Sequence, residues 1–493
     1  MKKYLITGMV MLLSNCAHSN NLQIGPVTFS VSSGSYYLNF TISWENSWRV
    51  TSPPGNRDAV WLFVKRRDCA ALQWHHANLA PQDTAHSAGN PLFVDAYADK
   101  KGVMVYRLAD GSGNISNVNV QLKLDSVPIG NYDYQVFGIE MVYVPQGAFY
   151  VGDGFSNNSL QLWPTTQPYL ISSEDSIQLG QDTGKLFHIN SSNPNTGIVD
   201  GTTLGQAYPK GFNAFYVMKY EVSQAQYADF LNTLTQDASA NRYLPSNSGM
   251  ERYNLQGAWP QIISTTPDRA CNWMSFQDLT ALLDWSALSP LTELEYEKLC
   301  RGSGNNAVAA EKAWGGITVT DANTIAAGSD GTPTEYVTDS ILTGSGLANF
   351  NSNVATFSGP LRCGFAARIN TNRFQSGSAY YGAMEMSGNL IERCYNLAIY
   401  NTATIGGGLF TGGHGDGELT STPNAGYANV GWPQEGFEPI FLEGYAVANK
   451  GGGYIRDIQR LNVADRFFAV ITDASTFQFR IQDYGGRGVS RRQ

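Results

Sequence analysis

The sequence has few charged residues, histidines or cysteines. Charged residues make up 15% of the 493 positions, and six cysteines and six histidines occur. No two cysteines have the CxxC spacing, so we do not expect a zinc site of the cysteine type. No run beyond the N-terminus reaches the ~20 apolar residues that a transmembrane helix needs. The formal charge of −9 argues against nucleic acid as the main partner.

Glycine and aromatic residues, in contrast, are abundant. The chain has 51 glycines, and aromatic residues make up 12% of it, within a hydrophobic content of 42%. This composition is typical of a loop-rich extracellular protein that is ordered by aromatic packing. The length allows two or three domains.

The first residues predict export. A basic start is followed by a short apolar run, as in a secretory signal, which we place at residues 1–19. Residues 13–16 (Leu-Ser-Asn-Cys) are similar to a bacterial lipobox with Cys16 as the lipidated residue, although Asn15 stands where a small residue is usual. Ordinary cleavage after Ser19 is the alternative. We therefore expect a location at the outer membrane, periplasm or cell surface, with a lipid anchor as the only membrane attachment, if there is any.

The remaining cysteines leave two alternatives open. Lipidation of Cys16 would leave an odd number: Cys69, Cys271, Cys300, Cys363 and Cys394. Export permits disulfides, but the spacing does not assign a pairing. Free buried thiols fit the sequence equally well.

Residues 21–135 have the pattern of a β-sandwich. Short strands are predicted at 23–31, 36–44, 59–66, 103–108 and 118–124, separated by glycine, asparagine, proline and serine. Residues 59–66 form a continuous apolar run, as central strands do. We expect Trp44, Trp48 and Trp61 to fill the sandwich core. Nothing here indicates catalysis, so a spacer or adhesion role is expected.

Residues 139–493 form a second expected domain with several short helices. A strand at 215–222 leads into a helix for which Ser223 is a good N-cap. Another helix is predicted at 279–285. Thr292 caps a third, in which Glu293 and Glu295 occupy the favourable first turn.

Five motifs of this region, in order and spacing, resemble the formylglycine-generating enzyme, or sulfatase-modifying-factor, family. They are residues 140–152 (opening Glu-Met-Val-Tyr-Val-Pro), 215–227, 271–279, 289–302 and 384–393. The resemblance implies a C-type-lectin-like fold with a small antiparallel core and many ordered loops. The expected fold class is therefore α+β: an all-β sandwich followed by this fold, with much irregular structure.

Residues 388–392 (Gly-Asn-Leu-Ile-Glu) form a candidate cation site. A glycine turn followed by Asn389 and Glu392 can direct oxygen ligands to one point, as calcium requires. The resemblance implies calcium bound by the Asn389 side chain, the Leu390 carbonyl and the Glu392 carboxylate, in a structural role. The alternative is a buried turn in which both side chains satisfy backbone donors.

The catalytic residues of the family's enzymes have no counterpart. Its oxidases need a thiol pair after a Gly-Gly-Ser strand to hold copper, and the matching residues 451–466 contain no cysteine. Related iron enzymes use three histidines, and no such set is visible. We assign no catalytic residue. A copper or non-haem iron oxidase with a rearranged site remains the alternative, and a structural envelope or adhesion component is a third hypothesis.

The C-terminal segment is also similar to the display scaffolds of diversity-generating retroelements. Residues 451–454, Arg466 and residues 485–489 correspond to their glycine-rich frame. The side chains between them mix aromatic, arginine and acidic groups, which suits binding of a protein or glycan. We expect ligand contacts from Tyr454, Arg456, Asp457, Gln459, Arg460, Asn462, Asp473, Phe477, Phe479 and Arg480. Period-2 burial would place part of this set in the core instead.

Overall fold

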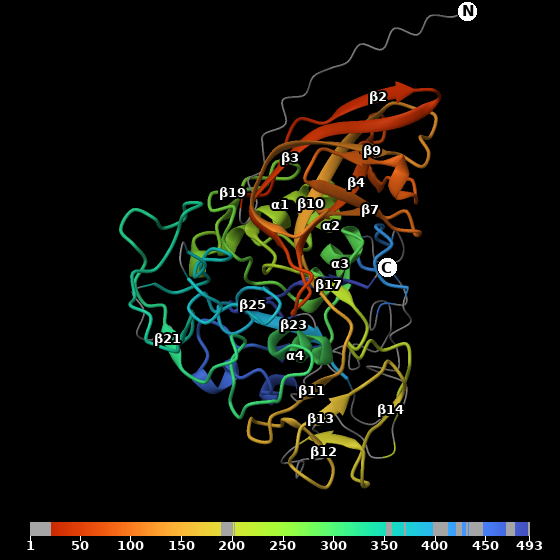
Figure 1. The fold of residues 1–493 in the computed structure, drawn as a ribbon. Helices are drawn as coiled ribbons and strands as arrows, with labels where there is room; N and C mark the ends of the chain where they lie inside the picture. The colour runs from red at the N-terminus through yellow and green to blue at the C-terminus, as the bar shows by residue number, and fades with distance from the viewer. Residues whose placement is uncertain are drawn as a thin grey trace, which may run out of the picture.

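The structure is a computed structural model that describes residues 21–188, 201, 203–351, 357–368, 371–397, 413–420, 426–429, 432, 447–469 and 479–491 (Figure 1). Within these ranges the fold is mixed and mostly strands, with two large sheets, six small sheets and four α-helices. The longest helices there have 10 residues, so none is long and apolar enough to cross a membrane.

In the upper part of Figure 1, the five-stranded sheet packs face to face against the N-terminal strands of the eight-stranded sheet. The five-stranded sheet contains β1 (Gln23–Ile24), β2 (Thr28–Ser32), β3 (Ser35–Arg49), β9 (Gly111–Lys123) and β6 (Ser87–Ala88). The eight-stranded sheet has the order β20 (Ser289–Pro290), β26 (Gly488–Ser490), β17 (Phe215–Met218), β10 (Tyr132–Val144), β4 (Asp58–Asp68), β8 (Val103–Arg107) and β7 (Leu92–Ala96), and β5 (Trp74–His76) pairs with β4. The sandwich strands predicted from the sequence all form, although the first is divided into β1 and β2.

Strand β4 is buried on both faces, as its apolar run predicts. Val60, Leu62 and Val64 face the five-stranded sheet. Trp61 and Phe63 face the other way, into a core that includes helix α3. Strand residues alternate between faces, so one strand contributes to two cores.

The expected tryptophan core is correct only for Trp44. Trp44 is buried between the two sheets. Trp61 lies on the opposite face of β4, where its Nε1 donates to the carbonyl of Ser286 (2.8 Å). Trp48 follows irregularities in the β3–β9 register and packs against a third core. The sequence predicted that these three tryptophans pack in the interior. The alternation of side chains along each strand and the register shift in β3 determine which core each tryptophan joins.

Strand β10 connects the two expected domains without a break. It pairs with β4 from Tyr132↔Asp68 to Val142↔Asp58, and its last residues also pair with β17. The boundary expected between residues 135 and 139 lies inside this strand. The eight-stranded sheet therefore extends from residue 58 into the C-terminal residues 488–490.

The helices begin at side-chain caps, as the sequence predicts. Helices α1 (Gln224–Thr233) and α4 (Glu293–Arg301) have complete capping boxes at Ser223 and Thr292. Helix α3 (Phe276–Trp285) starts three residues earlier than expected because Ser275 caps it with Asp278. A short helix, α2 (Gln236–Ala240), follows α1.

Small sheets and loops make up the rest of the fold. The two-stranded sheets are β11 (Phe149–Val151) with β13 (Tyr169–Ile171), β12 (Leu160–Leu162) with β15 (Leu186–His188), β14 (Ile177–Gln178) with β16 (Thr203–Leu204), β18 (Leu255–Gln256) with β19 (Ile263–Ser264), and β21 (Val319–Asp321) with β22 (Gly346–Ala348). A three-stranded sheet joins β24 (Val447–Lys450), β23 (Ile391–Tyr395) and β25 (Tyr484–Gly485). Strands β11 to β14 lie at the opposite end of the molecule from β2 (Figure 1).

Candidate functional site

The turn at residues 387–390 leads into β23 and has two successive residues with positive φ. Gly388 has a φ of 93° and Asn389 a φ of 66°. A Cβ on Gly388 would lie 2.7 Å from the carbonyl oxygen of Asn349, so glycine is required. Asparagine tolerates the left-handed region better than most residues do. This tight turn places the Asn389 side chain in the protein interior.

Asn389 is surrounded by protein hydrogen-bond partners. Its Nδ2 donates to Glu221 Oε2 (2.5 Å), and its Oδ1 accepts from the Leu361 N–H (2.8 Å) and from Asn349 Nδ2 (3.1 Å). The N–H of Leu390 donates to the other oxygen of Glu221 (2.9 Å). Glu221 therefore fixes the turn through both of its carboxylate oxygens.

Glu392 forms a buried ion pair with Arg487. Arg487 Nε donates to Glu392 Oε1 at 2.6 Å. The same guanidinium donates to the carbonyls of Met218 (3.2 Å), Lys219 (3.1 Å) and Met384 (2.8 Å). Both side chains are buried. Arg487 thus ties the C-terminal strand region to β17 and to the loop before the turn.

Three carboxylates lie around this one guanidinium, and we call Glu221, Glu385, Glu392 and Arg487 the buried charge cluster. Burial, followed by repulsion from Glu392 and Glu385, raises the pKa of Glu221 well above its ordinary value. Burial raises the pKa of Glu392 and raises that of Glu385 to about 7. Burial alone would lower the pKa of Arg487, but Glu392 and the other carboxylates raise it.

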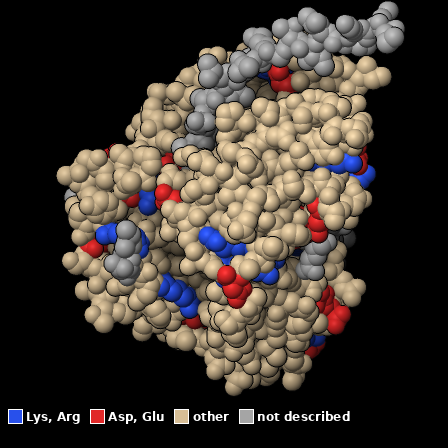
Figure 2. Space-filling view, turned by 45° about the horizontal axis from the view of Figure 1, so that its top comes forward, with Lys and Arg blue, Asp and Glu red and all other residues tan. Residues whose placement is uncertain are grey.

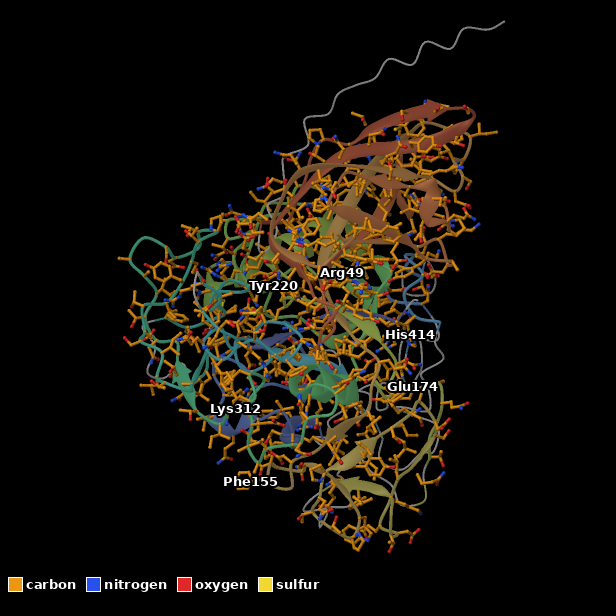
Figure 3. The ribbon with its side chains drawn as sticks, in the orientation of Figure 1. Arg49, Phe155, Glu174, Tyr220, Lys312 and His414 are labelled. Carbon is orange, nitrogen blue, oxygen red and sulfur yellow. The ribbon has the colours of Figure 1, made fainter. Side chains whose placement is uncertain are left out.

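A small cavity adjoins this cluster. It has a volume of about 10 Å³ and is lined by Glu140, Tyr220, Glu221 and Gln226 together with apolar side chains. That volume holds a water molecule at most. Tyr220, labelled in Figure 3, marks this position where the N-terminal strands meet the rest of the chain. The cluster joins β17, the loop before the turn and the C-terminal strand region through its hydrogen bonds.

The stability of the protein is expected to fall as the pH rises through the titration of Glu385. The pKa of Glu385 is about 7 in the folded protein, above its ordinary 4.5, so the folded state favours the protonated form. Its stabilising contribution is complete below pH 4.5 and is lost as the pH rises to about 7. Between pH 4.5 and pH 8, the free energy of unfolding should fall further in wild type than in the Glu385→Gln variant. The difference between the two falls should be up to about 3 kcal/mol.

Denaturant unfolding at the two pH values measures this difference. Glu45→Gln, at a partly exposed position of β3, serves as the control and should keep the wild-type pH dependence. An equal loss of stability in wild type and Glu385→Gln would contradict a raised pKa at this residue.

Calcium binding at the turn stays a prediction. The contacts that Asn389 and Glu392 make in the structure do not favour it. Asn389 Oδ1 already accepts two N–H groups, and Glu392 is paired with a cation of the protein. Calcium needs several oxygens directed at one point, so these contacts would have to change. Among the described residues, no three His, Cys, Asp or Glu side chains form a group that could hold a metal. A melting temperature unchanged by EGTA would count against calcium binding.

The residues predicted to contact a ligand divide into buried and exposed members. Tyr454 and Asn462 are buried. Arg480 is half-buried and forms an ion pair with the buried Asp278 (2.6 Å). Five members lie at or near the surface: Arg456, Asp457, Gln459, Arg460 and Phe479. Two lie outside the described residues: Asp473 and Phe477.

Two short 3₁₀-helices, Ile458–Leu461 and Phe467–Ala469, bring most of the exposed members together. We call this the 456–468 surface, and it consists of Arg456, Asp457, Ile458, Gln459, Arg460, Phe467 and Phe468. The guanidinium of Arg460 lies 3.9 Å from the ring centroid of Phe467, and that of Arg456 lies 4.8 Å from that of Phe468. The two rings meet edge to face at 5.1 Å. Phe467 is 42% exposed in this arrangement, whereas the side chains of Arg460 and Arg456 are 11% and 23% exposed.

Ion pairs position the two arginines of this surface. Arg456 pairs with the buried Asp483 (2.5 Å), and Arg460 pairs with Asp465 (3.0 Å). Ile458, which is 44% exposed, was not among the residues predicted to contact a ligand. It stands between the polar residues Asp457 and Gln459 in a segment without strand periodicity, and this is the only feature of the sequence that indicates its exposure.

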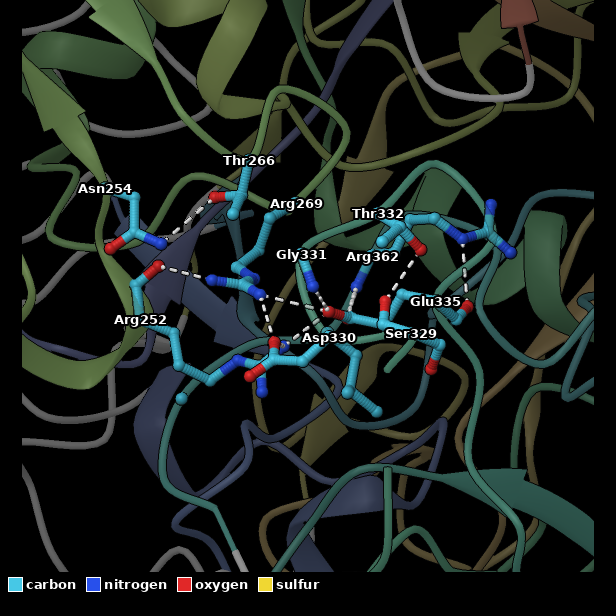
Figure 4. Close-up of polar contacts among 12 residues, drawn as sticks. Arg252, Asn254, Thr266, Arg269, Ser329, Asp330, Gly331, Thr332, Glu335 and Arg362 are labelled. Atoms are coloured by element: carbon cyan, nitrogen blue, oxygen red, sulfur yellow. Dashed lines mark hydrogen bonds and ion pairs between the residues drawn. The ribbon is translucent and has the colours of Figure 1, made fainter. Parts of the chain in front are cut away.

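A second charged group lies among the loops that flank the turn (Figure 4). Arg252 and Arg269 both contact the buried Glu335, at 2.7 and 3.0 Å, and Arg269 also contacts the exposed Asp330 (2.7 Å). The N–H of Arg362 donates to Glu335 (2.8 Å). Burial alone would raise the pKa of Glu335, but Arg252 and Arg269 lower it. Arg252 and Glu335 thus hold Pro360 and Arg362 on either side of Leu361, whose N–H donates to Asn389.

Three of the buried thiols have raised pKa values. Cys271, Cys300, Cys363 and Cys394 are buried, and Cys69 is exposed. Burial raises the pKa of Cys300 to about 12 and those of Cys271 and Cys394 well above their ordinary value. A thiolate is the reactive form, so these thiols are protonated at neutral pH.

Neither a scan against protein-family models nor a search of curated proteins gave a match. The resemblance of residues 139–493 to the formylglycine-generating enzyme family therefore rests on the motifs alone and stays a hypothesis.

Proposed function

We propose that the chain is an exported cell-envelope binding protein that recognises a protein or glycan through the 456–468 surface. In this proposal residues 139–493 form a catalytically silent, C-type-lectin-like scaffold. The buried charge cluster and the contacts of Asn389 hold the scaffold rigid. The ligand is then bound at the surface, not at the centre.

The observation that carries the proposal is the exposed ring of Phe467, which is held in place by stacking on the largely buried Arg460. Phe467 is 42% exposed although it is a large apolar side chain. Aromatic and arginine side chains contribute most of the energy in protein interfaces. Stacking also limits their freedom before binding, which reduces the entropy lost on association. Asp457 and Gln459 add polar groups at the rim.

The lack of cysteines in residues 451–466 favours binding over oxidase chemistry. The family's oxidases need reactive thiols near residues 451–466, where this sequence has none. The cavity beside Glu221 is too small for a peptide. Oxidation of a sulfatase-type cysteine peptide by the copper-loaded protein would overturn the proposal and favour the enzyme alternative.

The Phe467→Ala variant is expected to weaken ligand binding about tenfold or more, as loss of an interface anchor does. The labelled full chain would be titrated against a glycan array and against immobilised bacterial envelope proteins. Phe374→Ala, another exposed phenylalanine, is the matched control and should bind as wild type does. Both variants should keep the wild-type unfolding midpoint because the replaced rings are exposed.

Two outcomes would contradict this expectation. Saturable binding that Phe467→Ala leaves unchanged would place the ligand elsewhere. The absence of saturable binding to either target would favour a structural envelope role.

A further inference from the structure

A groove of about 550 Å³ runs across the five-stranded sheet, away from the 456–468 surface. Its polar side chains come from four strands of one sheet: Thr28, Asn39, Thr41, Ser87, Asn119 and Gln121. The volume lies in the range of small-molecule sites. The cavities beside α3 and Glu221, at about 20 and 10 Å³, are far smaller. The groove is thus the largest of these hollows.

Strand alternation puts the polar side chains of β3 and β9 on the floor of the groove. Leu38, Phe40 and Ile42 point into the sandwich core. The residues between them, Asn39 and Thr41, therefore point outward. Asn119 and Gln121 do the same on β9, where Gln121 is the register partner of Asn39. The floor is a row of amide and hydroxyl groups.

A break between β1 and β2 forms one wall. Strand β3 pairs with β1 at Ile42 and with β2 up to Asn39, and the intervening chain crosses close to Thr41. A Cβ on Gly25 would lie 2.4 Å from Thr41 Oγ1, so glycine permits this approach. Pro26, which has no N–H, follows it and lines the groove. Ser87 and Gly89 line the other side.

Some polar side chains of the floor are held by hydrogen bonds to each other, and others are exposed to solvent. Gln121 Nε2 donates to Asn39 Oδ1 (2.8 Å), and Asn39 Nδ2 donates to Ser30 Oγ (2.9 Å). These bonds fix the Asn39 amide. Asn119 and Ser87 are exposed, and Thr41 and Gln121 are half-buried. Their donors and acceptors are presented to the solvent side of the groove.

The lining chemistry selects an uncharged polar ligand. None of the described residues that line the groove is charged. Lys123, the register partner of Tyr37, lies outside the lining. Figure 2 shows the charged side chains of the visible face as isolated spots between wide uncharged areas. A charged ligand would therefore lose solvation without gaining a partner in the groove.

We propose that this groove binds a neutral saccharide chain. Vicinal hydroxyls both donate and accept hydrogen bonds, as do the amide and hydroxyl groups of the floor. The Asn119 and Gln121 amides and the Thr41 and Ser87 hydroxyls line the groove within one sheet face, so a chain of hydroxyl groups can meet several of them at once. The site is separate from the 456–468 surface and does not depend on its function.

Calorimetric titration of the full chain tests the groove. The probes are maltohexaose, cellohexaose, mannohexaose and xylohexaose, with polygalacturonate as the acidic comparison. We expect saturable binding of at least one neutral hexasaccharide and none of polygalacturonate. Asn119→Ala and Gln121→Ala should each weaken that binding roughly tenfold, as loss of well-placed hydrogen bonds does.

Ser116→Ala, an exposed residue of β9 outside the groove, should bind as wild type does. Failure of all four neutral probes overturns the proposal. So does equal binding of polygalacturonate, or binding that Asn119→Ala and Gln121→Ala leave unchanged. Loss of saccharide binding in Phe467→Ala would instead assign the saccharide to the 456–468 surface.

Discussion

Replacing Arg487 with methionine is expected to lower the free energy of unfolding by about 3–5 kcal/mol. The guanidinium is fully buried and donates to Glu392 and to the carbonyls of Met218, Lys219 and Met384. Methionine fills a similar space but leaves Glu392, and the nearby Glu221, without a cation. An unpaired buried carboxylate costs far more than the pair itself contributes.

Denaturant unfolding at neutral pH measures this effect, with two comparisons. The double variant Arg487→Met/Glu392→Gln should recover part of the loss because it removes the orphaned charge. Arg67→Met, which breaks an exposed pair with Asp133, should cost about 1 kcal/mol or less. A similar small cost for Arg487→Met would contradict the central role of this residue.

Replacing Trp61 with alanine is expected to cost about 3–5 kcal/mol, as for other buried aromatic truncations. Trp61 is fully buried, stacks on Tyr97 with 5.6 Å between ring centroids, and donates to the Ser286 carbonyl at the end of α3. It therefore joins the N-terminal strands to a helix more than two hundred residues away. Trp61→Phe keeps most of the packing and should cost clearly less.

Thermal unfolding followed by calorimetry and tryptophan fluorescence tests this connection. Because β10 and Trp61 couple the two halves, the Trp61→Ala variant should unfold in a single transition at a lower temperature. Two transitions, of which only one shifts, would show instead that residues 21–135 unfold as an independent domain.

Local signals in the sequence predicted much of the secondary structure. Ser223 and Thr292 cap helices because a side-chain oxygen and the residue three positions later are sufficient for a capping box. The apolar run that forms β4 predicted a strand buried on both faces. These features depend on neighbours in the sequence.

The contacts that define the site depend on distant residues. Asn389 was correctly identified as part of a tight turn, but its partner Glu221 lies 168 positions earlier. Arg487, 95 positions after Glu392, has no local signal that it enters the core. Likewise, nothing near residue 135 indicates that β10 pairs with both β4 and β17. Spacing alone cannot choose between a cation and a protein partner for such side chains.

Blocking the 456–468 surface tests the account most directly. In a Cys69→Ser background, Ile458→Cys would be labelled with a bulky polyethylene glycol maleimide, because Ile458 is 44% exposed. The same label at Leu108→Cys, an exposed position directly after β8, is the control. We expect the label at residue 458 to abolish binding to the envelope ligand and the label at residue 108 to leave it unchanged. Unchanged binding after labelling at residue 458 would contradict this expectation.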